Sequence, residues 1–204
     1  MAIAILFRSL KPKTSLQKIL IWLQLFFSGA LLGSLAWAGH GLENSRWHLF
    51  ADVLHLLAAG FWPTGLLLLA LFLRKLRQVP DLAQWQSIAA LVRRFSALSL
   101  GSVALLATTG FVNSWFLVGS FSNLLEQHYG RWLLAKIILF CFAVTIGAVN
   151  LLRLKPLLLI EDSQAQNFET TVAQLQFNVR MELILGTAII IIVAILGILP
   201  PAVH

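Results

Sequence analysis

The sequence predicts an all-α integral membrane protein, a helical bundle with about five transmembrane helices. Its 204 residues are 59% hydrophobic and 11% charged, with a mean hydropathy of +0.85. Soluble domains average about 45–50% apolar and about 25% charged residues. The apolar residues are concentrated in runs of roughly 20, and at about 1.5 Å per residue such a run crosses the ~30 Å hydrocarbon core of a bilayer. Most Lys and Arg residues lie between these runs, on one side.

Five apolar runs mark the expected helices, at residues 16–38, 47–73, 95–118, 132–152 and 181–199. Residues 1–15 are expected to form a cytoplasmic N-terminal segment, and residues 16–204 a single transmembrane domain. In the second run, Pro63 should kink or locally unwind the helix, because proline lacks an N–H and clashes with the preceding turn.

The third and fifth runs each begin beside basic residues. Arg93 and Arg94 precede the third run, where cytoplasmic headgroups are expected. The polar stretch EDSQAQNFETTVAQLQFNVR, residues 161–180, has few helix breakers, so we expect a helix that leads into the fifth run. Glu182 opens that run, and we expect it to pair with Arg180, Arg93 or Arg94, or to mark an inner exit for an ion.

Small residues inside the runs should let neighbouring helices approach closely. Gly101, Gly110 and Gly147 lie in the third and fourth runs, near Ser, Ala and Thr residues. In membranes, such small side chains are enriched where helices pack against one another. We therefore expect all three glycines at helix contacts.

The positions of the Lys and Arg residues predict the orientation. Twelve of the fifteen fall on one side of the runs. These twelve are Arg8, Lys11, Lys13, Lys18, Arg74, Lys75, Arg77, Arg93, Arg94, Arg153, Lys155 and Arg180. The other side has only Arg46 and Arg131, and Lys136 lies within the fourth run. Cytoplasmic loops are rich in Lys and Arg, so we expect the N-terminus inside and the C-terminus outside.

All five histidines fall toward the outer face in this orientation: His40, His48, His55, His128 and His204. Three ionisable residues, His48, Asp52 and His55, are spaced i, i+4 and i+7, so they share one face of the second helix. Charged groups in hydrocarbon are costly, and they therefore face the bundle interior or a wet cavity and seek partners.

Two polar residues on other helices should reach the depth of Asp52. Asn113 in the third run and Lys136 in the fourth lie a similar distance from the outer end, about 6–8 Å below the surface. We expect Asp52 to pair with Lys136, with Asn113 and His55 as neighbours. The alternatives are a buried polar clamp that only aligns helices, or a Lys136 side chain that extends to the headgroups.

The functional interpretation of these residues is a metal site. Imidazole nitrogens with a carboxylate suit Cu(II), Zn(II) or Ni(II), whereas Cu(I) prefers sulfur ligands. Sulfur is scarce on the outer side, because Met1 and Met181 should be inside and Cys141 lies within a run. The candidate metal ligands are His40, His48, Asp52, His55 and His128. A transmembrane haem would need two imidazoles on facing helices at one depth, and only His55 lies clearly within a run, so we favour the metal site over haem.

Other function classes find little support in the sequence. The net charge of +7 fits basic cytoplasmic loops, and no aromatic–basic motif for nucleic acid occurs, so we expect no nucleic-acid partner. No Ser–His–Asp, paired-carboxylate or phosphate-loop pattern occurs either, so we do not expect an enzyme.

Several stretches, in order and spacing, resemble the copper resistance protein D family over roughly residues 36–200. They are AWAGH (36–40), ADVLHLLAAGFWPTG (51–65), RRFSALSLGSVALLATTGFVNSW (93–115), YGRWLLAK (129–136) and RMELILG (180–186). The family positions that carry over are His40, Asp52, His55, Trp62, Asn113, Tyr129 and Lys136. Among them, Trp62, Asn113 and Lys136 are expected to be structural or to line an ion path.

The resemblance implies a bacterial inner-membrane helical domain that handles copper, with transport from the periplasm toward the cytoplasm. It implies the lipid bilayer and a small periplasmic copper-binding protein as partners, and leaves oligomerisation open. Two departures matter: the family usually has W-x-G-G where this chain has Trp62-Pro63-Thr64-Gly65, and its long members carry further N-terminal helices. The alternatives are a haem- or quinone-linked electron-transfer subunit, or a scaffold for a secreted metal chaperone.

Overall fold

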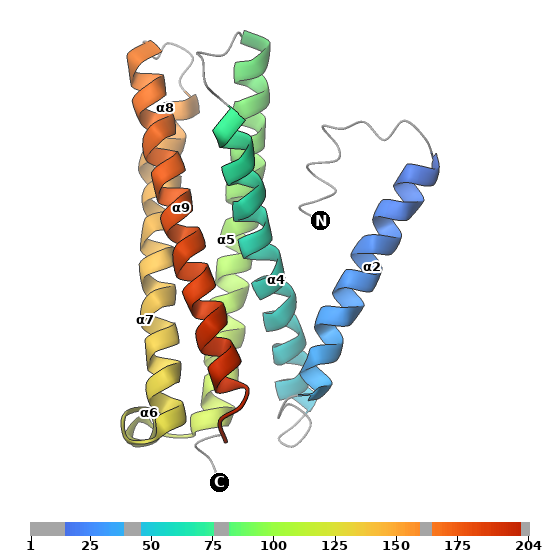
Figure 1. Cartoon of the computed structure of the whole chain (residues 1–204), viewed down its shortest axis with the longest axis vertical. Coiled ribbons are helices and arrows are strands. Elements are labelled where there is room, and N and C mark those ends of the chain that lie inside the picture. Colours follow the sequence, from blue (N-terminus) through green and yellow to red (C-terminus); the bar gives the residue numbers. More distant parts are fainter. Residues whose placement is uncertain (1–14, 39–45, 76–81, 160–164, 201–204) are drawn as a thin grey trace. The chain divides into compact units, whose positions relative to one another are not determined.

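Helices account for nearly all of the described chain, and no strand occurs among these residues. The computed structural model describes residues 15–38, 46–75, 82–159 and 165–200 (Figure 1). Its elements are α2 (Ser15–Ala38), α4 (Arg46–Lys75), α5 (Leu82–Val118), α6 (Phe121–Glu126), α7 (His128–Val149), the π-helical segment η1 (Asn150–Leu154), α8 (Lys155–Leu159) and α9 (Ala165–Leu196). The predicted all-α class is confirmed.

Five helical segments are long and apolar enough to cross a membrane. They are Ser15–Ala36, Trp47–Arg74, Ala90–Val118, His128–Leu158 and Glu169–Leu196. Many large apolar side chains on them are exposed, such as Phe111 at 71% and Ile190 at 57%. Outward-facing apolar side chains are expected where the surroundings are acyl chains instead of water. The chain is therefore a multi-pass membrane protein, as predicted.

Two helix ends differ from the sequence expectation, and one expectation is confirmed. The third helix begins at Leu82, well before the expected residue 95, because helix formers continue the helix beyond the apolar run. The fourth continues past the expected residue 152 through η1 and α8. The polar stretch before the fifth run is helical from Ala165, and α9 passes without a break into the span. Hydropathy marks where a helix crosses lipid and not where its hydrogen bonding stops.

The chain forms two compact units. The first comprises Met1–Gly65 with Ser102–Leu117, and the second comprises Leu66–Gly101 with Val118–His204. The first unit therefore holds α2, the N-terminal part of α4 and the C-terminal part of α5. The second holds the remainder of α4 and α5 together with α6, α7, η1, α8 and α9.

In the first unit, α2 packs on α4 through two glycines. A Cβ added at Gly29 would lie 3.8 Å from Cδ2 of Leu57, and one at Gly33 would lie 3.7 Å from Cγ1 of Val53. Because the two glycines are four residues apart, they lie on one face of α2, and an added Cβ at either would make ordinary van der Waals contact with α4.

The α4 helix stays α-helical through Pro63, so the predicted local unwinding is wrong. The other expected effect of Pro63, a kink in α4, stays a prediction, since proline removes one helical hydrogen bond. Next to Pro63, the hydroxyl of Thr64 donates to the backbone carbonyl of Gly60 at 2.7 Å. Such back-bonding by Thr often bends helices.

In the second unit, α7 and α9 lie side by side (Figure 1). Val179 and Leu158 are almost completely buried in its core. Gln176 Nε2 donates to the backbone carbonyl of Leu73 at 2.7 Å, and so ties α9 to the end of α4. At the other end, Gly119 turns the chain out of α5 with a φ of 70°, a conformation that glycine adopts without strain.

Candidate functional site

Four polar side chains on α4 and α5 form a buried cluster in the first unit, the α4–α5 polar cluster: Asp52, His55, Thr109 and Asn113. Asn113 Nδ2 donates to Asp52 Oδ1 at 3.0 Å, and His55 Nδ1 lies 3.0 Å from Thr109 Oγ1. Asp52 and His55 are three residues apart and Thr109 and Asn113 are four apart, so each pair follows one helix face. Two side-chain hydrogen bonds therefore join α4 to α5.

The cluster is enclosed by protein. Thr109 and Asn113 are 6% and 9% exposed, and Asp52 and His55 are half-buried. The predicted requirement that ionisable residues at this depth turn away from acyl chains is met, because both acidic and imidazole groups bond to the neighbouring helix.

Thr109 determines which nitrogen of His55 carries the proton. The Thr109 hydroxyl has one proton, and it donates that proton to the backbone carbonyl of Leu105 at 2.5 Å. With its proton directed at Leu105, the hydroxyl is left to accept from His55, and we infer that the imidazole proton lies on Nδ1. A neutral imidazole in this tautomer binds metal ions through Nε2.

Gly110 gives the imidazole its room. A Cβ at this position would lie 3.3 Å from Cε1 and 3.7 Å from Nδ1 of His55. The expected close packing is therefore observed at Gly110 and also at Gly147, which lies against Glu182. It is wrong for Gly101, because no atom lies within 4 Å of the Cβ position there.

Asn113 contributes an oxygen as well as an amide. Its Nδ2 points at the carboxylate of Asp52, so its Oδ1 points the other way. That oxygen is buried and has no hydrogen-bond partner among the described residues. An orphaned buried acceptor usually meets a water or an ion. The cluster thus offers one imidazole nitrogen and oxygens from one carboxylate and one amide.

His48 lies one turn before Asp52 on α4 and is 2% exposed. Its ring stacks on Phe116 of α5, with centroids 4.9 Å apart and an interplanar angle of 25°. This contact fixes the ring at the end of the α4–α5 polar cluster. The i, i+4, i+7 spacing therefore does place His48, Asp52 and His55 along the α5-facing side of α4.

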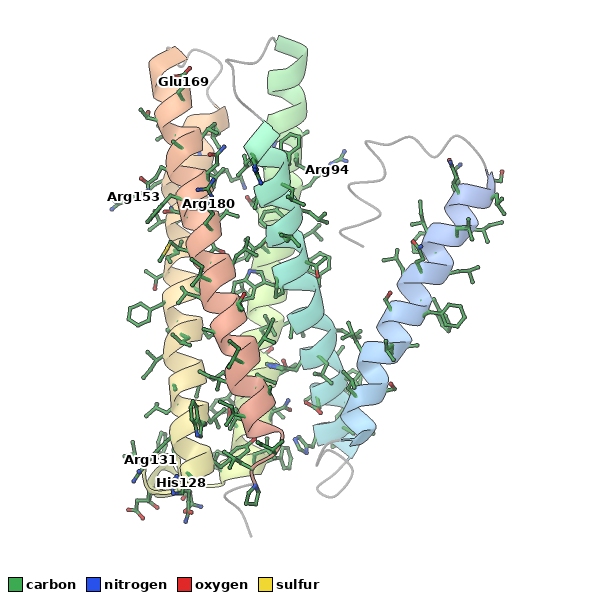
Figure 2. All side chains as sticks on the ribbon, in the orientation of Figure 1. Arg94, His128, Arg131, Arg153, Glu169 and Arg180 are labelled. Carbon is green, nitrogen blue, oxygen red and sulfur yellow. The ribbon has the colours of Figure 1, made fainter. Side chains whose placement is uncertain are left out.

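The remaining predicted ligands are not brought into the cluster. His40 lies outside the described residues, and His128 is exposed at the start of α7 in the second unit, beside Arg131 (Figure 2). Within the described ranges, no three His, Cys, Asp or Glu side chains gather closely enough to hold a metal ion. The metal site therefore stays a prediction.

Three further residues of the predicted site are placed by the structure without a test of their role. Trp62 is 6% exposed on α4 and Tyr129 is 8% exposed on α7. Lys136 is half-buried on α7, in the second unit, so its predicted pairing with Asp52 also stays a prediction.

Thr109 and Phe116 are the site residues that the sequence did not reveal. Thr109 precedes Asn113 by one helical turn in TTGFVN, so it shares a face with a polar residue already singled out. That spacing was the available signal. Nothing in the sequence distinguishes Phe116 from the other aromatic residues of α5.

These features define a class: a multi-pass α-helical membrane protein with a nitrogen–oxygen polar site enclosed between two of its helices. The sequence signature described as copper resistance protein D matches residues 89–196, more than half of the chain. The chain belongs to the copper resistance protein D family.

Two curated relatives support this assignment. The chain is 33% identical over 207 residues to "Copper resistance protein D" of Pseudomonas syringae pv. tomato. The aligned region covers 98% of this chain and 64% of the relative. It is 35% identical over 131 residues to "Copper transport protein CutJ" of Bacillus subtilis (strain 168). That aligned region covers 63% of this chain and 23% of the relative. The chain thus spans only part of the length of both proteins. No solved structure matches it.

Proposed function

We propose that this protein transports copper across the bacterial inner membrane, from the periplasm toward the cytoplasm, and so contributes to copper tolerance. Both curated relatives are named for copper, one for resistance and one for transport. In the proposed path, His40 and His128 capture the ion at the outer face, and His48, Asp52 and His55 then bind it in turn along α4.

The observation that carries the proposal is the hydrogen-bonded relay from His55 through Thr109 to the Leu105 carbonyl. A metal-binding imidazole usually donates its second N–H to a fixed acceptor, which sets the ring orientation and the tautomer. The 3.0 Å and 2.5 Å contacts supply that arrangement inside a membrane helix pair.

A site with few ligands suits an ion-transport path better than it suits storage of the ion. A site that must release its ion cannot bind it with a full set of rigid ligands, because conduction needs binding that is favourable but weak. The Asp52 carboxylate and His55 Nε2 would form successive binding sites with few ligands, and the Asn113 amide would hold the carboxylate in place. The bend expected near Pro63, two turns beyond His55, supplies a place where α4 changes conformation.

Copper accumulation in cells and copper content of the detergent-purified protein test the proposal. We expect wild-type protein to bind copper and raise cellular copper, a His40→Ala/His55→Ala double variant to lose bound copper, and Asp52→Asn to lose accumulation. The exposed carboxyl of Glu126, changed to Gln, serves as the control and should behave as wild type. Equal accumulation in wild type and Asp52→Asn would contradict the path and leave only a scaffold for a small periplasmic copper-binding protein.

The haem- or quinone-linked alternative predicts a coloured protein with a Soret band. A haem between two imidazoles needs them on opposing helices. His48 and His55 both lie on α4, and the sequences of α2 and α5 contain no histidine. No observation in the first unit therefore favours haem over copper.

A further inference from the structure

A second buried polar group lies in the other unit, between α9 and the end of α7. Glu182 Oε1 accepts from Asn150 Nδ2 at 2.6 Å, and Asn150 Oδ1 accepts from Asn178 Nδ2 at 2.7 Å. Asn178 Oδ1 in turn accepts from Gln174 Nε2 at 2.9 Å. We call these four residues the amide–carboxyl chain. The copper path proposed above uses none of them.

The amide–carboxyl chain connects the buried carboxyl of Glu182 to the surface. Gln174 is exposed, whereas Asn178 and Glu182 are 7% and 4% exposed. Eight residues separate Gln174 from Glu182, which is about 12 Å along α9. The hydrogen-bonded groups therefore reach from the outside of the unit to a carboxyl in its interior.

Among the described residues, the Glu182 carboxyl has one side-chain donor and no counter-ion. The expected pairing of Glu182 with an arginine is wrong, because Glu182 bonds Asn150 and forms no ion pair with any described residue. The other ionisable side chains described on the elements around it are Arg74, Arg93, Arg94, Arg153, Lys155, Glu169 and Arg180. All are exposed except the half-buried Lys155, and Figure 2 shows Arg153 pointing outward. On α7, Lys136 lies fourteen residues before Asn150, about 21 Å along the helix.

The local backbone is built around this contact. The π-helical segment η1 begins at Asn150, the residue that bonds Glu182. Single π-turns within α-helices occur frequently at functional sites, where they redirect a side chain. On the preceding turn, Gly147 lies beside the carboxyl, and a Cβ there would be in ordinary van der Waals contact with Glu182 Oε2, at 3.7 Å.

We propose that Glu182 is a reversible proton-binding site, and that the amide–carboxyl chain solvates it toward the Gln174 end of α9. The carboxylate takes a proton from a hydronium ion, which leaves as water, and becomes a neutral carboxylic acid; the amide groups keep their own protons, and the reverse step returns the proton to water. An ionised carboxyl in an apolar interior is stable only when it is paired or well hydrogen-bonded, and Glu182 has a single amide donor. Protonation removes the charge and leaves the Asn150 hydrogen bond to Oε1 in place.

A proton fits this site better than a metal cation does. A hard cation needs several oxygens directed at one point. Here the amide oxygens of Asn150 and Asn178 accept hydrogen bonds within the chain, and the Asn150 amide directs its N–H at the carboxylate. The arrangement solvates a carboxyl group and does not form a cage.

Infrared difference spectroscopy on the full chain in lipid tests the site directly. Titration with acid should reveal the C=O stretch of a buried carboxylic acid, with a shift on H/D exchange. The band should be absent in Glu182→Gln, which keeps the shape and the Asn150 contact, and present in Glu169→Gln, an exposed carboxyl on the same helix. In Asn150→Ala the band should move to higher wavenumber, because the carbonyl loses its hydrogen bond. The Asp52 carboxyl is separated by the same measurement on Asp52→Asn, in which the Glu182 band should remain. A Glu182→Gln spectrum identical to that of wild type, or no band in wild type, would overturn the proposal.

A coupling between proton binding at Glu182 and copper transport rests on the proposed function. A second measurement tests this coupling separately from the proton site. In proteoliposomes, copper entry into wild type should be accompanied by proton movement that a trapped pH dye reports, and Glu182→Gln should abolish that proton movement. Copper entry without proton movement in wild type would overturn the coupling. Absence of copper entry in wild type would contradict the transport function, while the infrared result would still decide the proton site.

Discussion

At the scale of single residues, one threonine hydroxyl determines what His55 can bind. Its proton is directed at the Leu105 carbonyl, so we infer that the hydroxyl accepts from His55 Nδ1 and that the imidazole lone pair lies on Nε2. A hydrophobic residue at position 109 would fill the same space without this directional effect. The chemistry proposed for the first unit therefore depends on a residue that never touches the ion.

Thr109→Val should weaken copper binding by roughly 10–100-fold, the range seen when a group that orients a ligating histidine is removed. The loss follows because His55 Nδ1 loses its acceptor and the ring can take the other tautomer. Competition titration with a copper chelator on purified protein measures it. Thr108→Val is the matched control, because Thr108 is exposed and bonds only backbone carbonyls of its own helix. Equal loss in both variants would contradict the relay.

Gly110→Ala should disturb the same imidazole by a steric route. A Cβ there lies 3.3 Å from His55 Cε1, so the ring must shift by a few tenths of an ångström and the 3.0 Å contact with Thr109 lengthens. We expect copper binding to weaken by about tenfold, since partners that hold a ligand in position contribute at least this much. Gly101→Ala, with open space at its Cβ, is the control measured in the same titration. Unchanged affinity in Gly110→Ala would show that the ring position is not critical.

The sequence predicted part of the candidate site, and the part it missed has a physical reason. The shared face of His48, Asp52 and His55 follows from helical spacing alone. Their partners lie on α5, 54 residues from His55 in one contact and 61 from Asp52 in the other. Hydropathy gives the depth of Asn113 but not the rotation of α5 about its axis, so Thr109 and Phe116 stayed unidentified.

At the scale of helices, the spans follow from composition and the close contacts from small residues. The number and order of the five spans were predicted, because about 20 apolar residues are needed to cross the bilayer, whereas the fifth span begins at Glu169 and not at the expected residue 181. Boundaries outside the membrane, such as Leu82 of α5, carry no hydropathy signal. The π-turn at Asn150 was not predicted, because no residue pattern specifies it.

Gly130→Ala should destabilise the junction of α6 and α7. A Cβ at Gly130 would collide with the backbone carbonyl of Asn123 and with Cα of Leu124, and backbone atoms cannot rotate away. Overpacking of this kind costs about 1–3 kcal/mol. Thermal unfolding in detergent, followed by circular dichroism, should show a lower midpoint than in wild type. Gly186→Ala is the control, because its Cβ would meet no atom within 4 Å, and its unfolding midpoint should equal that of wild type. An equal decrease of the midpoint in both variants would contradict the proposed collision at Gly130.

At the scale of the whole molecule, the distribution of charge predicts which end is cytoplasmic. In the second unit, Arg94, Arg153 and Arg180 lie toward one end, and His128 and Arg131 at the other (Figure 2). The excess of Arg at the first end agrees with the sequence prediction that this end faces the cytoplasm. The predicted orientation matters for the proposed function, because copper transport from the periplasm requires the histidine-rich side to face the periplasm.

The single cysteine makes this orientation testable by thiol labelling. Cys141 lies within the fourth span, so Cys141→Ala gives a background without thiols. In that background, Ser122→Cys on α6 and Glu169→Cys at the start of the fifth span place one thiol at exposed positions near opposite ends of the second unit (Figures 1 and 2). A membrane-impermeant maleimide applied to intact spheroplasts should label Ser122→Cys alone, and both variants after lysis. The opposite pattern would put the basic loops in the periplasm, and the histidines of α4 could then not receive copper from that side.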